Sequence, residues 1–92
     1  MEYRIESVKV LSLGTTETEV ELGCSAFLIE NGSTEAVVYL KEKDYDGVAV
    51  TENNGFAVAP GTLLPVVLCG HCLSLVASDA ATDVRLLLLE AL

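Results

Sequence analysis

The chain has 92 residues, of which 51% are hydrophobic and 21% are charged, and its formal net charge is −9. A chain of this length accommodates one core, so we expect a single domain over residues 1–92. The negative charge opposes contact with the phosphates of nucleic acids and with anionic membranes, and we expect neither as a partner.

The first half of the chain contains apolar and β-branched runs that are typical of strands. Residues 3–13 form the first predicted strand, and its alternation slips once near Ser7, which indicates a β-bulge. After a turn over residues 14–16, glutamates at positions 17, 19 and 21 alternate with apolar or β-branched residues. Period two places these acids together on one solvated face. The run continues to residue 29, where both faces become apolar.

The rest of the chain repeats this alternation of short strands and turns. Turn signals are expected at residues 31–33, 43–47, 51–55, 59–61, 70 and 78–82. Strands are expected at residues 36–40, 48–50, 56–58, 63–68, 72–77 and 83–89. The Asn31-Gly32-Ser33 turn is predicted because Asn and Gly tolerate positive φ. Pro60-Gly61 predicts a type II turn, and Pro65 predicts an edge strand or a bulge.

The number and spacing of these segments define the expected fold class. Seven or eight strands recurring every ~8–12 residues predict an all-β, antiparallel β-sandwich, with a jelly roll or a related Greek key as its topology. The alternative at the C-terminal end is a short helix over residues 83–92, because Leu and Ala favour helices.

The sequence also bears on location. Residues 1–4 lack a basic start followed by an apolar run, and the longest apolar stretches are far shorter than the about 20 residues that a membrane helix needs. Three cysteines, an odd number, argue against a disulfide-built secreted fold. We therefore expect synthesis and residence in a reducing cytoplasm, unless the protein is carried out within a larger assembly.

Cys69-Gly70-His71-Cys72 matches the dithiol motif of disulfide isomerases. In that family a helix N-terminus lowers the pKa of the first cysteine, whereas here strand residues flank the motif and predict a turn. The same side chains offer three zinc ligands at most, and a structural zinc site normally has four. We expect neither redox catalysis nor a metal or other cofactor.

Asp44-Tyr45-Asp46-Gly47 is similar to the opening of a calcium loop, but no bidentate acid follows at the required spacing. The loops that contain Asp44, Tyr45, Asp46, Asn53 and Asn54 are candidate ligand loops. A carbohydrate- or peptide-binding β-module is therefore the alternative function. We expect no enzymatic activity, because His71 is the one histidine, no serine sits in a nucleophile-elbow pattern, and no glycine-rich phosphate loop precedes a helix.

The apolar content is high for a small domain, with a mean hydropathy of +0.48. A surplus of this kind predicts that another chain covers some apolar surface. Four successive leucines would lie on both sides of a strand, one side filling the sandwich and the other meeting a second chain. The candidate self-association residues are Leu86, Leu87, Leu88, Leu89, Phe27 and Ile29.

Residues 35–89 resemble small virion-associated proteins of tailed phages and prophages. The resemblance is carried by segments that include Val37-Val38-Tyr39-Leu40-Lys41, Asp46-Gly47-Val48-Ala49-Val50-Thr51, Gly55-Phe56-Ala57-Val58-Ala59-Pro60-Gly61, Leu73-Ser74-Leu75-Val76-Ala77-Ser78 and Thr82-Asp83-Val84-Arg85. It implies a head-decoration, tail or spike-base part, commonly a homotrimer, with other virion proteins as possible partners. It supplies no catalytic residue. A self-associating structural module of a phage-like particle is therefore the first hypothesis.

Overall fold

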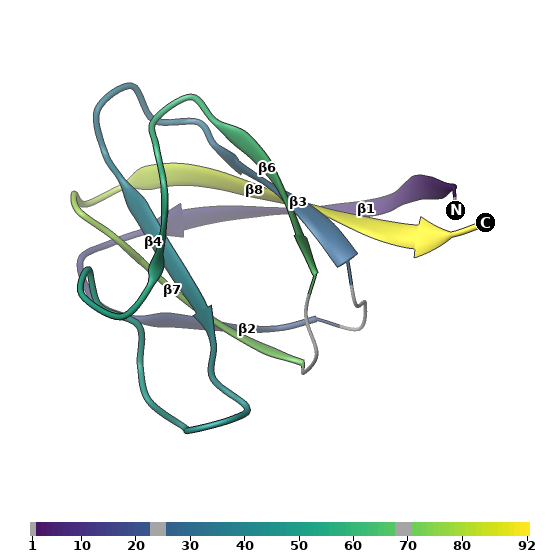
Figure 1. Cartoon of the computed structure of the whole chain (residues 1–92). Helices are drawn as coiled ribbons and strands as arrows, with labels where there is room; N and C mark the ends of the chain where they lie inside the picture. Colours follow the sequence, from purple (N-terminus) through teal and green to yellow (C-terminus); the bar gives the residue numbers. More distant parts are fainter. Residues whose placement is uncertain (1, 23–25, 68–70) are drawn as a thin grey trace.

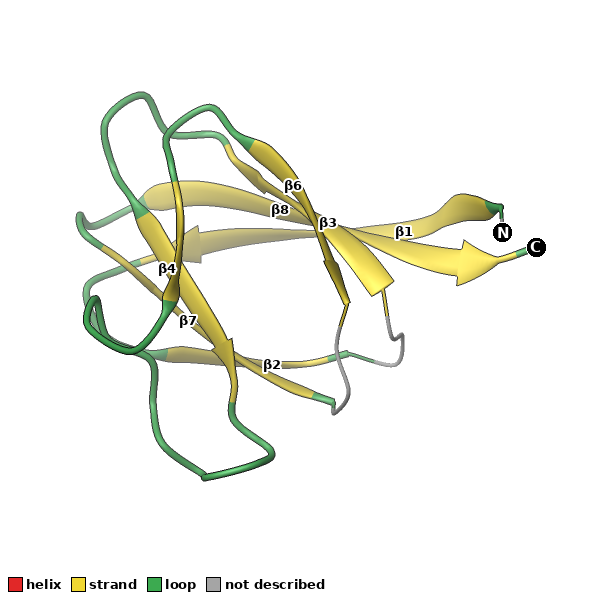
Figure 2. Cartoon of the chain, viewed as in Figure 1, coloured by secondary structure: helices red, strands yellow, loops and turns green. Residues whose placement is uncertain are grey.

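The computed structural model describes residues 2–22, 26–67 and 71–92. These residues form an all-β arrangement of two four-stranded antiparallel sheets and contain no helix (Figures 1 and 2). The strands are β1 (Tyr3–Leu13), β2 (Thr18–Glu21), β3 (Ala26–Asn31), β4 (Val38–Glu42), β5 (Phe56–Val58), β6 (Leu63–Val67), β7 (Cys72–Ala77) and β8 (Thr82–Ala91). The all-β prediction is confirmed, and the two layers agree with a sandwich.

Strand order follows a simple rule. Sheet A has the order β1-β8-β3-β6 and sheet B the order β2-β7-β4-β5. The first strand pairs with the eighth, the second with the seventh, the third with the sixth and the fourth with the fifth, always antiparallel. Pairing of β3 with β8 and of β4 with β7 completes the two sheets. Each half of the chain therefore depends on the other half for its backbone hydrogen bonds.

The core lies between the sheets and is built by alternation along each strand. Its largest fully buried side chains come from both layers and include Phe27, Ile29, Leu73, Leu75 and Leu86. Burying an aliphatic or aromatic side chain of this size contributes about 1.5–3 kcal/mol to folding. The core residues form one continuous cluster, so the two sheets are held by side-chain packing.

The first and last strands form a long ribbon that extends beyond the rest of the molecule (Figure 1). The register shifts between Ile5 and Ser7, which confirms the predicted bulge. The alternative of a terminal helix over residues 83–92 is wrong. β8 lies between β1 and β3, so both of its edges are hydrogen-bonded, and this pairing overrides the helix propensity of its leucines.

Two predicted segments take a different path. The run over residues 17–29 is not one strand, because β2 belongs to sheet B and β3 to sheet A, while Cys24 lies outside the described residues. Residues 48–50 are not a strand, so the turn at 51–55 does not close a hairpin. The segment crosses the outer face of sheet B instead, where the buried Val50 donates its backbone N–H to the Ser74 hydroxyl (3.0 Å).

The turns confirm some expectations and correct one. Gly61 has φ 71°, and the Thr62 N–H donates to the Ala59 carbonyl at 3.2 Å, as expected for the predicted type II turn. β6, which contains Pro65, is an edge strand, also as predicted. Gly32 does not have the positive φ expected of it. An added Cβ there would lie 2.9 Å from an Asp83 carboxylate oxygen and 3.3 Å from the Asp83 carbonyl oxygen, so a larger residue would displace the Asp83 side chain.

Candidate functional site

The outer face of sheet A is apolar across all four strands. Cross-strand partners share a face, and Leu86 and Leu88 point into the core, so Leu87 and Leu89 point outward. The pairing registers of β1, β3 and β6 place further outward-pointing residues beside these two leucines. We call the whole set the apolar face: Tyr3, Ile5, Val8 and Val10 of β1, Leu87 and Leu89 of β8, Leu28 of β3, and Leu63, Pro65 and Val67 of β6.

One row of this apolar face is uninterrupted from edge to edge. Val8 lies opposite Leu87, Leu87 opposite Leu28, and Leu28 opposite Pro65. The edge strands leave their side chains most accessible, with Val8 50% and Val67 78% exposed, whereas the two leucines on the central strands are half-buried. This is the reverse of the usual antiparallel pattern, in which the solvent face of a sheet is polar.

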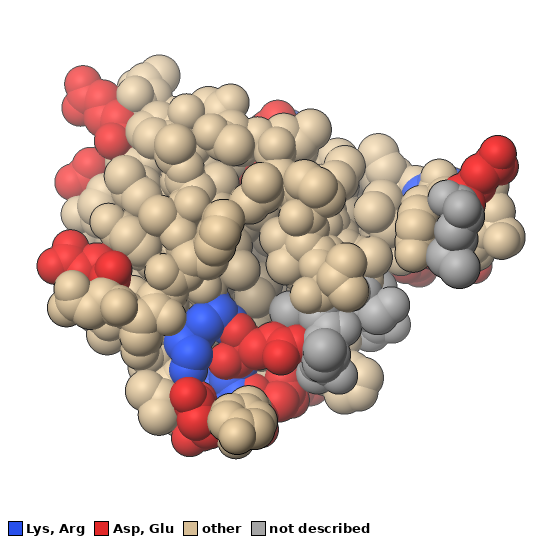
Figure 3. All heavy atoms as spheres, in the orientation of Figure 1, with Lys and Arg blue, Asp and Glu red and all other residues tan. Residues whose placement is uncertain are grey.

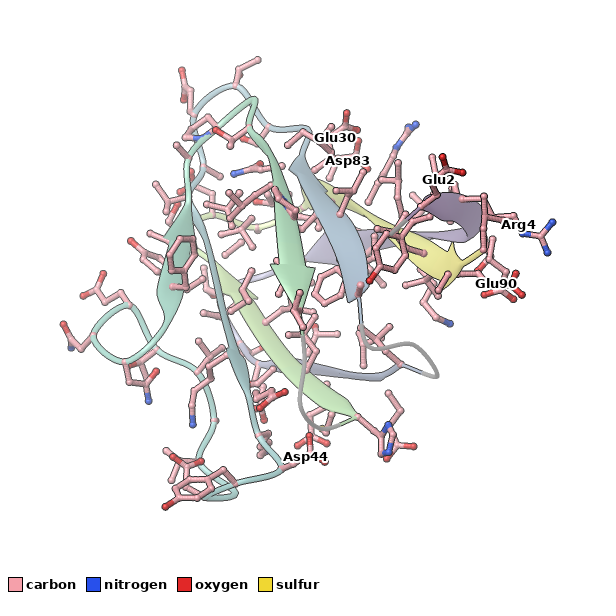
Figure 4. The ribbon with its side chains drawn as sticks, turned by 45° about the vertical axis from the view of Figure 1, so that its right-hand side comes forward. Glu2, Arg4, Glu30, Asp44, Asp83 and Glu90 are labelled. Carbon is pink, nitrogen blue, oxygen red and sulfur yellow. The ribbon has the colours of Figure 1, made fainter. Side chains whose placement is uncertain are left out.

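Charged groups lie at the two ends of the apolar face. Glu30 and Asp83 lie near one another at one end, and Arg4 and Glu90 lie at the tip of the ribbon (Figure 4). Arg4 donates to the Glu90 carboxylate at 2.9 Å, and its register partner on β8 is the same residue. Arg85 lies opposite Glu30 in the row nearest the first end. The middle rows carry no charge.

Sheet B presents a different outer face, because residues 43–55 cross it. Lys43 donates to Glu17 (3.0 Å) and to Glu19, and the buried Ser74 hydroxyl donates to Glu17. Figure 3 shows basic and acidic side chains side by side at the lower margin, below a broad area without charged side chains. Sheet B is therefore covered by its own chain and by ion pairs, and sheet A is not.

Hydrogen bonds and ion pairs on sheet B shift the pKa values of Glu17 and Lys43. The Ser74 hydroxyl, followed by Lys43, lowers the pKa of Glu17 below its ordinary value of 4.5. Hydrogen bonds to Glu19 and then Glu17 raise the pKa of Lys43 from 10.5 to about 12. The predicted solvated glutamate face is thus exposed at Glu19 and Glu21, whereas Glu17 is half-buried and bonded.

The predicted self-association residues divide between the two faces of sheet A. Leu86, Leu88, Phe27 and Ile29 are buried in the core of the chain itself, so they are not on a surface that a second chain could contact. Leu87 and Leu89 belong to the apolar face. Sequence reasoning missed the contributions of β1 and β6. The available signal was that both alternating sets of residues in 3–13 and 63–67 include apolar side chains.

The candidate ligand loops are one connection, residues 43–55, and its carboxylates bind the chain itself. The Asp44 carboxylate accepts the backbone N–H groups of His71 (2.9 Å) and Cys72 (2.7 Å). The Asp46 carboxylate accepts from Lys41 (2.8 Å) and from the Val48 N–H (2.9 Å), and the Lys41 bond is the main cause of its lowered pKa. These two groups fix the loop.

The remaining three candidates give no converging site. Asn54 accepts the Thr51 N–H at 2.6 Å and donates to the Ala49 carbonyl at 3.1 Å, and the Asn53 N–H donates to the Thr51 hydroxyl. Tyr45 is 94% exposed. A hollow of about 290 Å³ beside this connection is lined by residues that include Tyr39, Thr51, Glu52 and Val76, and by none of the five candidates.

The dithiol motif is only partly visible, because Cys69 and Gly70 lie outside the described residues. Cys72 is the first residue of β7 and not part of a helix. Burial, followed by the negative charges of Glu19, Asp44 and Glu21, raises the pKa of its thiol. A catalytic dithiol needs the opposite shift. Within residues 2–22, 26–67 and 71–92, no three His, Cys, Asp or Glu side chains form a metal-binding group.

Among the described residues, no helix is long and apolar enough to cross a membrane. Comparisons of the chain with known protein families, with curated proteins and with solved structures found no match.

Proposed function

We propose that this chain is a non-enzymatic structural module that self-associates, and that the apolar face of sheet A makes the contact. One observation carries the proposal: a four-stranded sheet whose outer face is uncharged in its middle rows and is left uncovered by the described chain. Antiparallel sheets keep a polar outer face when water is their neighbour, so an apolar one indicates a protein neighbour.

The size of the apolar face supports the same conclusion. Six of its exposed members are Tyr3, Ile5, Val8, Val10, Leu63 and Val67. Together they leave roughly 600 Å² accessible, which is the upper end of the largest patch on a typical monomer, about 300–600 Å². Leu28, Pro65, Leu87 and Leu89 enlarge the surface toward the about 800 Å² that each partner contributes to a standard interface.

The topology that we propose is a jelly roll. Pairing of each early strand with its counterpart counted from the other end, in two four-stranded sheets, is what results when one long antiparallel hairpin is rolled into two layers. Jelly rolls of eight strands recur in viral capsid proteins. Together with the sequence resemblance, this supports a part of a phage-like particle, for which the resemblance implies three copies and contacts with other virion proteins.

The ligand-binding alternative has weaker support, because Asp44, Asp46 and Asn54 are already engaged in holding the loop. An exposed tyrosine beside them does not form a pocket. We therefore retain self-association as the single proposal.

Sedimentation velocity of the purified chain at about 50 µM, a concentration that populates complexes of micromolar Kd, tests this proposal. We expect a mass above that of one chain. Because the copies repel one another through their net charge, the association should strengthen when salt is raised. A strict monomer at every salt concentration would contradict the proposal. Capsid, portal or tail genes beside the coding gene would support the phage assignment, and their absence would count against it.

A further inference from the structure

Resting on the proposed self-association, we infer that the apolar face packs on the same face of a second copy, sheet against sheet about a two-fold axis, which gives two copies in place of the three that the resemblance implies. We infer also that the copies do not join edge to edge. Two sheet surfaces are available in principle for a β-protein that associates with itself: the unpaired edges of its strands and the faces of its sheets. In this chain the strand edges are obstructed, whereas the outer face of sheet A is open.

Both edges of sheet A carry obstacles to the addition of another strand. β1 is interrupted by the bulge between Ile5 and Ser7. Lys9 lies opposite the buried Leu86, so its charged side chain is on the core side of an exposed edge. β6 contains Pro65, which has no backbone N–H to donate. Bulges, inward lysines and edge prolines are the devices by which natural sheets avoid edge pairing.

The edges of sheet B are obstructed by length and charge. β2 has four residues and exposes Glu19 and Glu21, and β5 has three residues. Strands this short offer few backbone hydrogen bonds to an incoming strand, and like charges across a β2 edge would repel. All four edges of the described sheets are therefore poor sites for strand addition.

The apolar face has no comparable obstacle. Its central row runs through Val8, Leu87, Leu28 and Pro65 without a polar side chain. Two such faces can approach to the about 10 Å of stacked sheets, with their side chains interdigitating as in a sandwich core.

The occupant that fits is another copy of this chain. The accessible surface of the apolar face approaches the about 800 Å² that one partner contributes to a standard interface, so it accommodates one neighbour, and a patch that contacts itself closes as a two-fold pair. Charge favours the same arrangement. Glu30 and Arg85 lie in the end row, between Val10 and Leu63, and other labelled acids lie at the ribbon tip and at Asp44 (Figure 4), so contact through the middle rows of two apolar faces buries no charged side chain.

The test is a set of single lysine substitutions measured by sedimentation equilibrium. Val8→Lys places a charge in the central row, where Val8 is 50% exposed. Val48→Lys makes the same change at a residue that is 49% exposed in the connection over sheet B. Ser7→Lys puts a lysine on the same edge strand but on its other side, opposite the core residue Leu88. Each variant lowers the net negative charge equally, so general repulsion does not distinguish them.

We expect the wild-type chain, Val48→Lys and Ser7→Lys to have twice the mass of one chain, and Val8→Lys to have a Kd at least about 100-fold higher, because a buried unpaired ammonium group opposes the contact. Val67→Lys, on the far edge strand of the same face, should act like Val8→Lys. It serves as the second variant if Val8→Lys fails to fold, which circular dichroism will reveal.

Two results would overturn the inference without affecting the proposed function. One is self-association that persists in both Val8→Lys and Val67→Lys, which would indicate edge pairing or another surface. The other is a mass of three chains, which a single self-contacting face does not produce. A wild-type chain that is monomeric would instead refute the proposed function and the inference together.

Discussion

Replacing Asn31 by alanine removes a buried hydrogen-bonding group that connects three segments of the chain. Asn31 ends β3, is fully buried, and donates from Nδ2 to the carbonyls of Ala36 (2.8 Å) and Val58 (3.0 Å). Its Oδ1 accepts the Ser33 N–H at 3.0 Å. The side chain thus ties the start of the β3–β4 connection to β5 in the opposite sheet.

The cost of the substitution follows from these three bonds. Each is worth about 1 kcal/mol, and more where a buried partner is left unpaired, so Asn31→Ala should lower the free energy of unfolding by about 3 kcal/mol. A domain of this length has about 5–14 kcal/mol in total. At about 4–8 °C per kcal/mol, Tm should fall by about 12–24 °C.

Asn54→Ala is the matched control, because Asn54 also accepts one backbone N–H and donates to one backbone carbonyl but is exposed. Water can replace its bonds, so we expect a loss of about 0.5–1 kcal/mol. Asn31→Asp keeps the volume and places a carboxylate against two carbonyl oxygens, and it should destabilise at least as much as alanine. Urea denaturation followed by circular dichroism measures all three variants.

The reasoning would be refuted if Asn31→Ala cost no more than Asn54→Ala, because burial of the partners would then not determine the penalty. It would also be refuted if Asn31→Asp were as stable as the wild-type chain, because the effect of alanine would then come from the cavity alone.

Three further predictions concern other parts of the fold. Gly61→Ala forces φ 71° on a residue with a Cβ and should cost about 1 kcal/mol in urea, whereas Gly14→Ala, where nothing lies within 4 Å and φ is not positive, should change stability by less than about 0.5 kcal/mol. Leu86→Ala should cost about 2–5 kcal/mol and Leu87→Ala less than half as much, since only the first fills the core; equal losses would contradict the assigned faces. Because the pKa of Glu17 is lowered, its carboxylate stabilises the fold above pH 4.5, and this contribution is lost as the pH falls through the lowered value. Glu17→Gln should therefore flatten the acid side of the Tm–pH profile, and an unchanged profile would argue against the shift.

Much of the fold could be predicted because it depends on local signals. The alternation in residues 3–13 and 72–77 defines β1 and β7, and the slip at Ser7 marks the bulge. Pro60-Gly61 specifies its turn through the φ preferences of two residues. These features need no knowledge of distant partners, so sequence reasoning reaches them.

The predictions that failed concern segments whose conformation depends on residues far away in the sequence. Residues 48–50 have a strand-like composition, but the Ser74 hydroxyl, 24 positions away, binds Val50 over the face of sheet B. Nothing in residues 17–29 indicates that the chain changes sheets between β2 and β3. The candidate surface was found only in part for the same reason. When both alternating sets of a strand are apolar, as at Leu86 and Leu87, only the packing of the neighbouring sheet shows which set faces inward.

The pairing of early strands with late ones has a consequence for biosynthesis. β7 and β8 are central strands of their sheets, and of the eight strands they are the last two to leave the ribosome. Until β8 has emerged, β1 has no partner, and β3 lacks one of its two neighbours. Until then the nascent chain holds apolar strands without their partners, and chaperones and sibling chains compete for the same surfaces.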